Sequence, residues 1–195
     1  YKRQIYSRLI QSFGEETARR YAKANQDAVR AYQDLIDVQG ISCDWEERCA
    51  YLYGPDVTVL QEEAEAARRL GLPASFTREV SIPIPHDGAV CFEGQAQFHP
   101  LKFLKVLADQ LTIYEQSRVL TAEGDLLTTE LGSVQAEHIV FACHFPFVNF
   151  PGMYFARMHQ ERSYVLALQG APPVDGMFLG VGRDTFSLRT YGELL

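Results

Sequence analysis

The stretch Gln95-Ala96-Gln97-Phe98-His99-Pro100-Leu101-Lys102 marks the point where a β-strand ends and a helix begins. Residues 89–98 have the composition of a strand, and His86-Asp87-Gly88 is a turn that joins them to an earlier predicted strand at 76–84. Pro100 suits the first position of the following helix, where a backbone N–H has no partner inside the helix. The buried side of this helix is predicted to carry Leu101, Leu104, Leu107 and Leu111.

Helices dominate the sequence before this stretch. Apolar side chains recur every three or four residues from Glu15 to Val38, with Ser12 as the predicted N-cap and Gly40 as the C-terminal glycine. The other elements predicted before residue 76 are a short helix at 4–10, a strand at 50–53 and a helix at 58–70.

Strands dominate the sequence after it. Strands at 113–121 and 126–131 are predicted to form a hairpin, and two short strands are expected within 134–143. The second of these, His138-Ile139-Val140-Phe141-Ala142, is apolar enough to be a buried parallel strand. Three more strands, predicted at 163–168, 176–182 and 185–190, would form an antiparallel meander. The predicted fold class is therefore α+β, with a mixed, largely antiparallel sheet and flanking helices.

The composition is that of a soluble globular protein. The 195 residues are 47% hydrophobic and 22% charged, with a formal net charge of -7 and no basic cluster. Nucleic acid and anionic membrane are therefore not expected as partners. The longest apolar stretch, around 141–155, contains prolines, a histidine and an asparagine, which excludes a transmembrane helix. The four cysteines form no CxxC pair, and we expect a reduced, cytoplasmic setting.

The short motifs that mark common catalytic sites are absent, so they indicate no type of reaction. The sequence contains no GxSxG, HExxH, GxGxxG or GxxxxGK[ST] pattern. Its histidines are spread over different predicted elements, so no metal site is expected, and no catalytic residue is assigned. His99 is interpreted as a helix-entry residue before Pro100 rather than as a base.

Several longer strings nevertheless follow one another in a characteristic order. They are Ile41-Ser42-Cys43-Asp44-Trp45, the opening stretch at 95–102, Ile113-Tyr114-Glu115-Gln116-Ser117-Arg118-Val119, Ala142-Cys143-His144-Phe145-Pro146, Arg162-Ser163-Tyr164-Val165-Leu166-Ala167-Leu168, Gly176-Met177-Phe178 and Ser187-Leu188-Arg189-Thr190. In this order and spacing they resemble the FAD-dependent oxidoreductases of the D-amino acid oxidase and glycine oxidase superfamily. The resemblance is strongest to the bacterial branch that often carries a C-terminal Rieske iron–sulfur domain, and it covers nearly the whole chain.

The resemblance also implies what is missing. Members of the family begin with a strand and a GxGxxG loop that holds the FAD pyrophosphate at a helix N-terminus, and this sequence has no such loop. Residues 1–195 are therefore expected to be the central, substrate-binding portion of a two-domain flavin enzyme. Residues of about 100–145 would contribute elements of its incomplete FAD-binding domain, and both ends of the chain would be boundaries within a longer protein.

The resemblance assigns four residues to the cofactor. The backbone of Val119 matches the strand that meets the adenine end of FAD, while Ala142, Cys143 and His144 match the turn near its phosphates and ribose. Three of the four have a plainer alternative. Val119 would pack in the core in either case, Cys143 would be a small buried hydrophobe, and His144 would cap a loop before Pro146.

Four further residues are assigned to the substrate. An arginine in the family's sheet commonly holds a substrate carboxylate through two parallel hydrogen bonds, and Arg189 matches it. Its alternative is a surface ion pair at a strand end. Tyr164, Met177 and Phe178 match positions that wall the substrate cavity, and the alternative for them is ordinary core packing.

The function implied by the resemblance is oxidation of a small amine or amino acid by hydride transfer to FAD. The 195-residue chain alone is expected to be inactive and not to retain FAD, because the phosphate loop is absent, and the parent chain could include a Rieske domain. Two alternatives stay open. One is a non-catalytic small-molecule-binding or scaffold domain derived from this family, and the other is a small-molecule-binding α+β domain unrelated to flavin.

Overall fold

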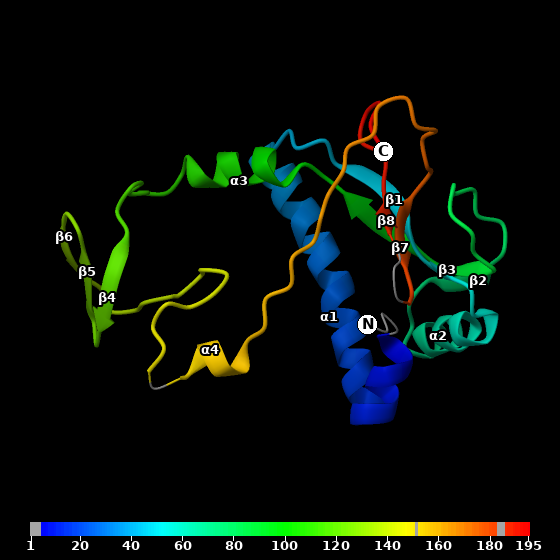
Figure 1. Ribbon diagram of the computed structural model, residues 1–195, viewed down its shortest axis with the longest axis horizontal. Coiled ribbons are helices and arrows are strands. Elements are labelled where there is room, and N and C mark those ends of the chain that lie inside the picture. The colour runs from blue at the N-terminus through cyan, green and yellow to red at the C-terminus, as the bar shows by residue number, and fades with distance from the viewer. Residues whose placement is uncertain (1–4, 151, 183–185) are drawn as a thin grey trace. The chain divides into compact units, whose positions relative to one another are not determined.

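The computed structural model describes residues 5–150, 152–182 and 186–195, which form two compact units (Figure 1). Unit 1 comprises the described residues of Tyr1–Asp109 and Ala167–Leu195, and unit 2 comprises those of Gln110–Leu166. Unit 1 has a five-stranded sheet in the order β2-β3-β1-β7-β8, and unit 2 has a three-stranded sheet in the order β4-β5-β6. The helices and the mixed, mainly antiparallel sheet confirm the predicted α+β class.

The chain builds most of unit 1, passes through unit 2 and then returns to unit 1. The elements of unit 1 are α1 (Tyr6–Gln39), β1 (Glu46–Gly54), α2 (Val57–Arg69), β2 (Ala74–Thr77), β3 (Gly88–Gln97), α3 (Pro100–Ala108), β7 (Met177–Gly180) and β8 (Ser187–Leu188). The elements of unit 2 are β4 (Val119–Glu123), β5 (Leu126–Thr129), β6 (Gly132–Gln135) and α4 (Tyr154–Arg157).

Helix α1 consists of two helical segments that meet at Gly14. The backbone of Gly14 has φ 79° and ψ 163°, a conformation that glycine adopts without a side-chain clash. The break separates the two N-terminal helices that the sequence predicts, and it lies two residues after the predicted N-cap, Ser12. At the other end Gly40 has φ 61° and its N–H donates to the carbonyl oxygen of Asp37, which confirms the predicted C-terminal glycine.

A buried carboxylate holds the N-terminus of α1. Glu63 of α2 is 1% exposed, and its Oε1 accepts from the backbone N–H groups of Ile5 (2.9 Å) and Tyr6 (2.8 Å). Its Oε2 accepts from the N–H (3.0 Å) and the hydroxyl (2.6 Å) of Ser7. The first N–H groups of a helix have no partner inside it and carry partial positive charge, so this one side chain satisfies several of them and joins α1 to α2.

Strand β1 lies at the centre of the unit 1 sheet. It pairs antiparallel with β3 and parallel with β7, and the parallel pairing joins residues 50–53 to residues 177–180. Neighbouring residues of β3 face opposite sides, so Val90 packs in the core formed with α1 and α2, whereas Ala89 packs in a second core with Tyr53 and Phe178.

Two strand predictions in the sequence are too long. The strand predicted at 76–84 ends at Thr77, because the following loop carries Pro83 and Pro85, which cannot donate to a sheet ladder. Of the predicted meander, β7 and β8 pair antiparallel as expected, while residues 183–185 lie outside the described residues. The segment 163–168 is not a strand, because only Leu168 exchanges backbone hydrogen bonds with another segment, at Leu195.

The buried side of α3 also differs from the prediction. Leu101, Leu104 and Leu111 are 69%, 54% and 67% exposed, whereas Phe103 is 5% exposed. The helix presents Phe103 because that side chain fills a cluster with residues of the α1 C-terminus and the loop after it. This cluster consists of Ile36, Ile41, Cys43 and Phe103, with Leu35, Trp45, Phe98, Val106 and Leu107 packed against it.

Unit 2 contains the predicted hairpin, but its first strand begins at Val119 and not at residue 113. Strands β4 and β5 pair up to Glu123 and Leu126 around a two-residue turn, in which Gly124 has φ 62°. Strand β6 confirms the first strand expected within 134–143. The buried parallel strand expected at 138–142 is wrong, because this segment has no strand partner among the described residues and Val140 is 85% exposed. An apolar strand is buried only when neighbouring elements cover it. The three-stranded sheet of unit 2 does not cover residues 138–142.

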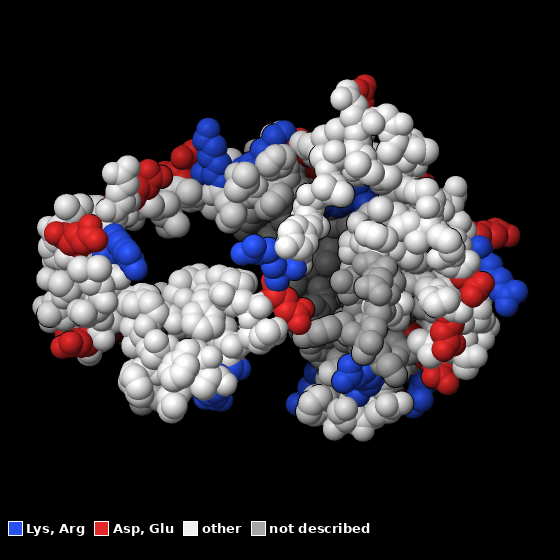
Figure 2. Space-filling model, viewed as in Figure 1, with Lys and Arg blue, Asp and Glu red and all other residues white. Residues whose placement is uncertain are grey.

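Charged side chains are dispersed over the surface. On the face in Figure 2, Lys and Arg side chains are interspersed with Asp and Glu, and neither sign forms a large patch. Residues 139–156 carry no charged side chain at all. None of the helices in the described part of the chain has the length and apolar character that a membrane span requires.

Candidate functional site

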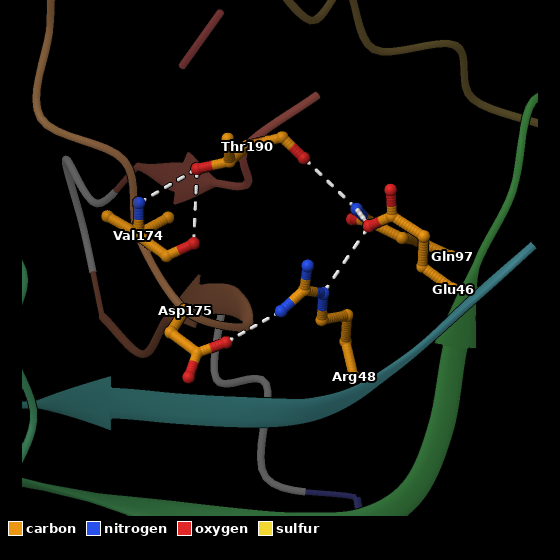
Figure 3. A network of polar contacts seen from close by, with 6 residues as sticks. All are labelled: Glu46, Arg48, Gln97, Val174, Asp175 and Thr190. Carbon is orange, nitrogen blue, oxygen red and sulfur yellow. Dashed lines mark hydrogen bonds and ion pairs between the residues drawn. The ribbon is translucent and has the colours of Figure 1, made fainter. Parts of the chain in front are cut away.

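Polar side chains form a network at one end of the unit 1 sheet (Figure 3). Gln97, the last residue of β3, donates from Nε2 to Glu46 Oε2 at 2.9 Å and to the carbonyl oxygen of Thr190 at 3.0 Å. Glu46 also accepts from Arg48 Nε at 3.3 Å, and Arg48 Nη1 pairs with Asp175 at 2.8 Å. The network therefore joins β1 and β3 to the segments before β7 and after β8.

Arg189 lies between the end of β8 and Thr190, whose side chain is held by two hydrogen bonds. Thr190 Oγ1 accepts from the N–H of Val174 at 2.8 Å and donates to the carbonyl oxygen of Val174 at 3.1 Å. Arg189 itself is exposed and makes no ion pair with any residue that the structure describes. The ion pair considered as an alternative is thus not observed within the described ranges.

A second set of contacts holds the next residue along. The hydroxyl of Tyr191 donates to Asp44 Oδ2 at 2.8 Å, and Lys102 Nζ donates to both carboxylate oxygens of Asp44, at 2.9 and 2.7 Å. The hydrogen bond from Lys102, and then that from Tyr191, hold the pKa of Asp44 below its usual range. The same carboxylate raises the pKa values of Lys102 and Tyr191. Positions 190 and 191 are therefore fixed from different sides.

The Asp44 contacts predict a pH-dependent stability. The pKa of Asp44 is lower in the folded protein, so its contribution is present above the unfolded value of about 4 and is lost as the pH falls through the folded value. We expect Asp44→Asn to lower the thermal midpoint of the full-length protein at pH 7 and to lower it less near pH 3, below the unfolded pKa. Asparagine also tolerates the left-handed backbone at this position, where φ is 54°, so the substitution tests the charge.

The matched control is Asp34→Asn, at an exposed position of α1 without a contact to another described side chain. It should leave the thermal midpoint unchanged at both pH values. An Asp44→Asn effect that is as large at pH 3 as at pH 7 would contradict the electrostatic explanation.

His99 is confirmed as a helix-entry residue. Its Nδ1 accepts from the backbone N–H of Lys102 at 3.4 Å, and Pro100 follows at the start of α3. The ring lies edge-on to Tyr191, with 5.9 Å between centroids. The side chain therefore caps the helix beside the Asp44 contacts.

The three predicted wall residues differ in their surroundings. Phe178 is 4% exposed and stacks on Tyr51 at 4.7 Å between ring centroids, so its ring belongs to the core. Met177 is half-buried and precedes it on β7, so the two side chains face opposite sides of the sheet and cannot line the same cavity. Tyr164 lies in unit 2 and is 86% exposed.

Val119 lines a hollow in unit 2. The hollow has a volume of about 370 Å³ and is lined by Arg118, Val119, Leu120 and Phe147. Arg118 is exposed and has no ion pair among the described residues, so a cation, an aromatic ring and a strand backbone border the same space.

Ala142, Cys143 and His144 are all exposed. The interpretation of Cys143 as a small buried hydrophobe is therefore wrong, for the same reason that the strand before it is absent. The loop-capping hydrogen bond considered for His144 does not occur among the described residues.

The family of the chain follows from comparison of its sequence with known proteins. Residues 5–192 match the family described as FAD dependent oxidoreductase. The chain belongs to this family. It is also 34% identical over 200 residues to YhfW of Bacillus subtilis (strain 168), which is named as a Rieske 2Fe-2S iron-sulfur protein. That alignment covers 95% of this chain and 39% of the relative.

The fold agrees with that of a solved oxidase structure. The chain matches the crystal structure of glycine oxidase from Geobacillus kaustophilus with a TM-score of 0.65 at 15% sequence identity. The match covers 89% of this chain and 53% of the glycine oxidase chain. This FAD dependent oxidoreductase chain thus spans about two fifths to one half of the proteins that it resembles.

The residues of unit 2 fit part of the flavin cofactor of such an oxidoreductase. The hollow beside Val119 offers the ring of Phe147 for stacking on a purine and the guanidinium of Arg118 for a phosphate or ribose oxygen. The exposed ring of His144 is a further donor for such oxygens. These groups suit the adenosine end of FAD, while the glycine-rich loop that would hold the pyrophosphate is not part of this sequence.

Gln97, Thr190 and Asp44 were not identified from the sequence as site residues, although each lies in one of the strings that carry the family resemblance. A usable signal was present at Gln97. Glutamine is seldom buried in a strand unless its amide has a specific partner, and Gln97 sits in a strand of mainly buried character.

Proposed function

We propose that this chain is the substrate-binding portion of an FAD-dependent oxidoreductase that oxidises a small amine or amino acid. Arg189 is the observation that carries the proposal. It is an exposed arginine without a carboxylate partner among the described residues, next to a strand end that hydrogen bonds hold in place. A guanidinium in this state can bind a substrate carboxylate through two parallel hydrogen bonds.

The two units have different roles in this proposal. Unit 1 is the substrate-binding part, and unit 2, Gln110–Leu166, supplies the flavin-domain elements that the sequence places at about 100–145. The hollow at Val119 and the exposed positions Ala142, Cys143 and His144 support a role of unit 2 in holding FAD. Flavin, when bound, would accept the hydride from the carbon that carries the amine.

Fewer residues are proposed to contact the substrate beside Arg189 than the sequence suggests. Met177 is half-buried, so part of its surface is open to a ligand. Tyr164 belongs to unit 2 and is 86% exposed, so its substrate role is proposed from the family resemblance alone. Phe178 would not contact the substrate directly. Its buried ring stacks on Tyr51 and would only support the side chains around the site.

We further propose that the parent protein is cytoplasmic and carries a Rieske domain that can take electrons from the flavin. The name of the B. subtilis relative supports the Rieske domain, and the four free cysteines support a reducing compartment.

The test uses the full-length protein that contains this chain. It is purified, its flavin absorbance is measured, and its turnover with an artificial electron acceptor is followed with matched pairs of glycine and methylamine, alanine and ethylamine, and proline and pyrrolidine. We expect stoichiometric flavin and a KM for one amino acid at least about tenfold below that of its paired amine. The isolated 195-residue chain should stay colourless.

Two results would contradict the proposal. A full-length protein without flavin would favour the non-catalytic scaffold derived from the family. Bound flavin that no amino acid or amine reduces would exclude this substrate class.

A further inference from the structure

Gln97 is a buried amide with one atom unpaired. The side chain is 9% exposed, its Nε2 donates two hydrogen bonds, and its Oε1 has no partner among the described residues. The orientation of the amide is set by its partners, because a flipped amide would place Oε1 against the Glu46 carboxylate and the Thr190 carbonyl oxygen. A buried oxygen without a partner is unfavourable for folding, and the two bonds donated by Nε2 are the polar contacts that hold the amide in place.

Those bonds act on the backbone next to Arg189. Gln97 holds the carbonyl oxygen of Thr190, and Val174 holds the hydroxyl of the same residue from both its N–H and its carbonyl (Figure 3). On the far side of Thr190, Tyr191 is tied to Asp44. β8 ends at Leu188, so the sheet ladder does not hold Arg189 and Thr190, and these side-chain contacts do so instead.

We propose that Gln97 and Thr190 are positioning residues for Arg189. They fix the strand end from which its guanidinium meets the substrate carboxylate, and they do not touch the substrate themselves. This inference rests on the proposed role of Arg189 in substrate binding.

The physical consequence concerns binding geometry. Two parallel hydrogen bonds to a carboxylate require the plane of the guanidinium to match the plane of the carboxylate. Loss of the whole pair of hydrogen bonds is expected to raise the KM for the amino acid about 100-fold. Loss of one anchoring bond leaves the others in place, so we expect a smaller effect of about tenfold on the KM for the amino acid.

The test compares four variants of the full-length, flavin-loaded protein. Gln97→Met removes both donated bonds and the unpaired oxygen, and Thr190→Val removes only the hydroxyl. Thr190→Ser keeps that hydroxyl and should restore normal binding. Gln95→Met is the matched control, because Gln95 lies two residues before Gln97 on β3 and its amide donates, among the described residues, to the carbonyls of Glu93 and Gly94.

Gln97→Met and Thr190→Val are expected to raise the KM for the amino acid about tenfold, while kcat and the KM for the paired amine stay within about twofold. Thr190→Ser and Gln95→Met should match the unmodified protein. Equal increases in both KM values with a large fall in the thermal midpoint would show a merely structural role and overturn the inference.

The inference and the function proposed for Arg189 can fail separately. If Arg189→Lys weakens amino-acid binding selectively and neither Gln97→Met nor Thr190→Val does, only the inference fails. If Arg189→Lys shows no preference for the amino acid over the amine, the proposed function fails and the inference with it. If Gln97→Met does not fold, the comparison of Thr190→Val with Thr190→Ser decides.

Discussion

Replacing Arg189 by methionine in the full-length, flavin-loaded protein is expected to raise the KM for the amino acid that reduces the flavin about 100-fold. The substitution removes a charge-assisted pair of hydrogen bonds to the substrate carboxylate. Arg189→Lys keeps the charge but not the planar fork of donors, so we expect an increase of about tenfold. The KM for the paired amine, which lacks the carboxylate, should not change in either variant. Steady-state turnover with an artificial electron acceptor that reoxidises the flavin, at several substrate concentrations, measures both values.

The matched control for this prediction is Arg78→Met. Arg78 is also exposed and has no ion pair with a described residue, but it lies in the loop after β2, outside the network of Figure 3. Both KM values should stay as they are in this variant. Equal effects of Arg189→Met on the amino acid and on the amine would count against carboxylate binding by Arg189.

Removal of the Glu63 carboxylate is the second large expected effect. Glu63→Ala leaves three backbone N–H groups and the Ser7 hydroxyl without their acceptor at a buried site, and we expect a loss of about 3 kcal/mol in the free energy of unfolding. Glu63→Gln keeps one acceptor oxygen but not the negative charge at the helix N-terminus, so its cost should be about half as large. Thermal unfolding of the full-length protein measures both.

Hydrogen exchange locates the effect. The amides of the first turn of α1 should lose protection first in Glu63→Ala, because they are the donors to the missing carboxylate. Glu62→Ala, at the exposed neighbouring position of α2, should change neither the midpoint nor the exchange. An equal loss in the Glu62 and Glu63 variants would show that helix propensity, rather than the cap, is responsible.

Elements whose signals are local could be predicted from the sequence. Gly40 ends α1, Pro100 opens α3 and Gly124 turns the β4–β5 hairpin, because each needs only a particular backbone conformation at its own position. Burial was harder to predict. The choice of Phe103 over Leu101 and Leu104 depends on a cluster contributed by α1, and residues far along the chain cannot be read from the period of one helix.

In the candidate site too, features with a local sequence signal could be predicted, and features that depend on distant contacts could not. Arg189 was proposed from its string, and the structure adds that its neighbours are anchored, which no sequence pattern indicates. The network depends on the register of β1 and β3, which places Glu46 opposite Gln97, and on contacts between residues more than 90 positions apart. Strand alternation likewise separates Met177 from Phe178, a distinction that the family resemblance alone does not make.

The parallel pairing of β1 with β7 has a consequence for biosynthesis. Strands β1, β2 and β3 can pair once residue 97 has left the ribosome, but β7 and β8 are made only after all of unit 2. During that interval one edge of β1 has no neighbour, and such an edge is a template for incorrect pairing with other chains. The contacts that fix Thr190 and Tyr191 are therefore among the last to form, and aggregation of nascent chains should be greatest before residue 177 is synthesised.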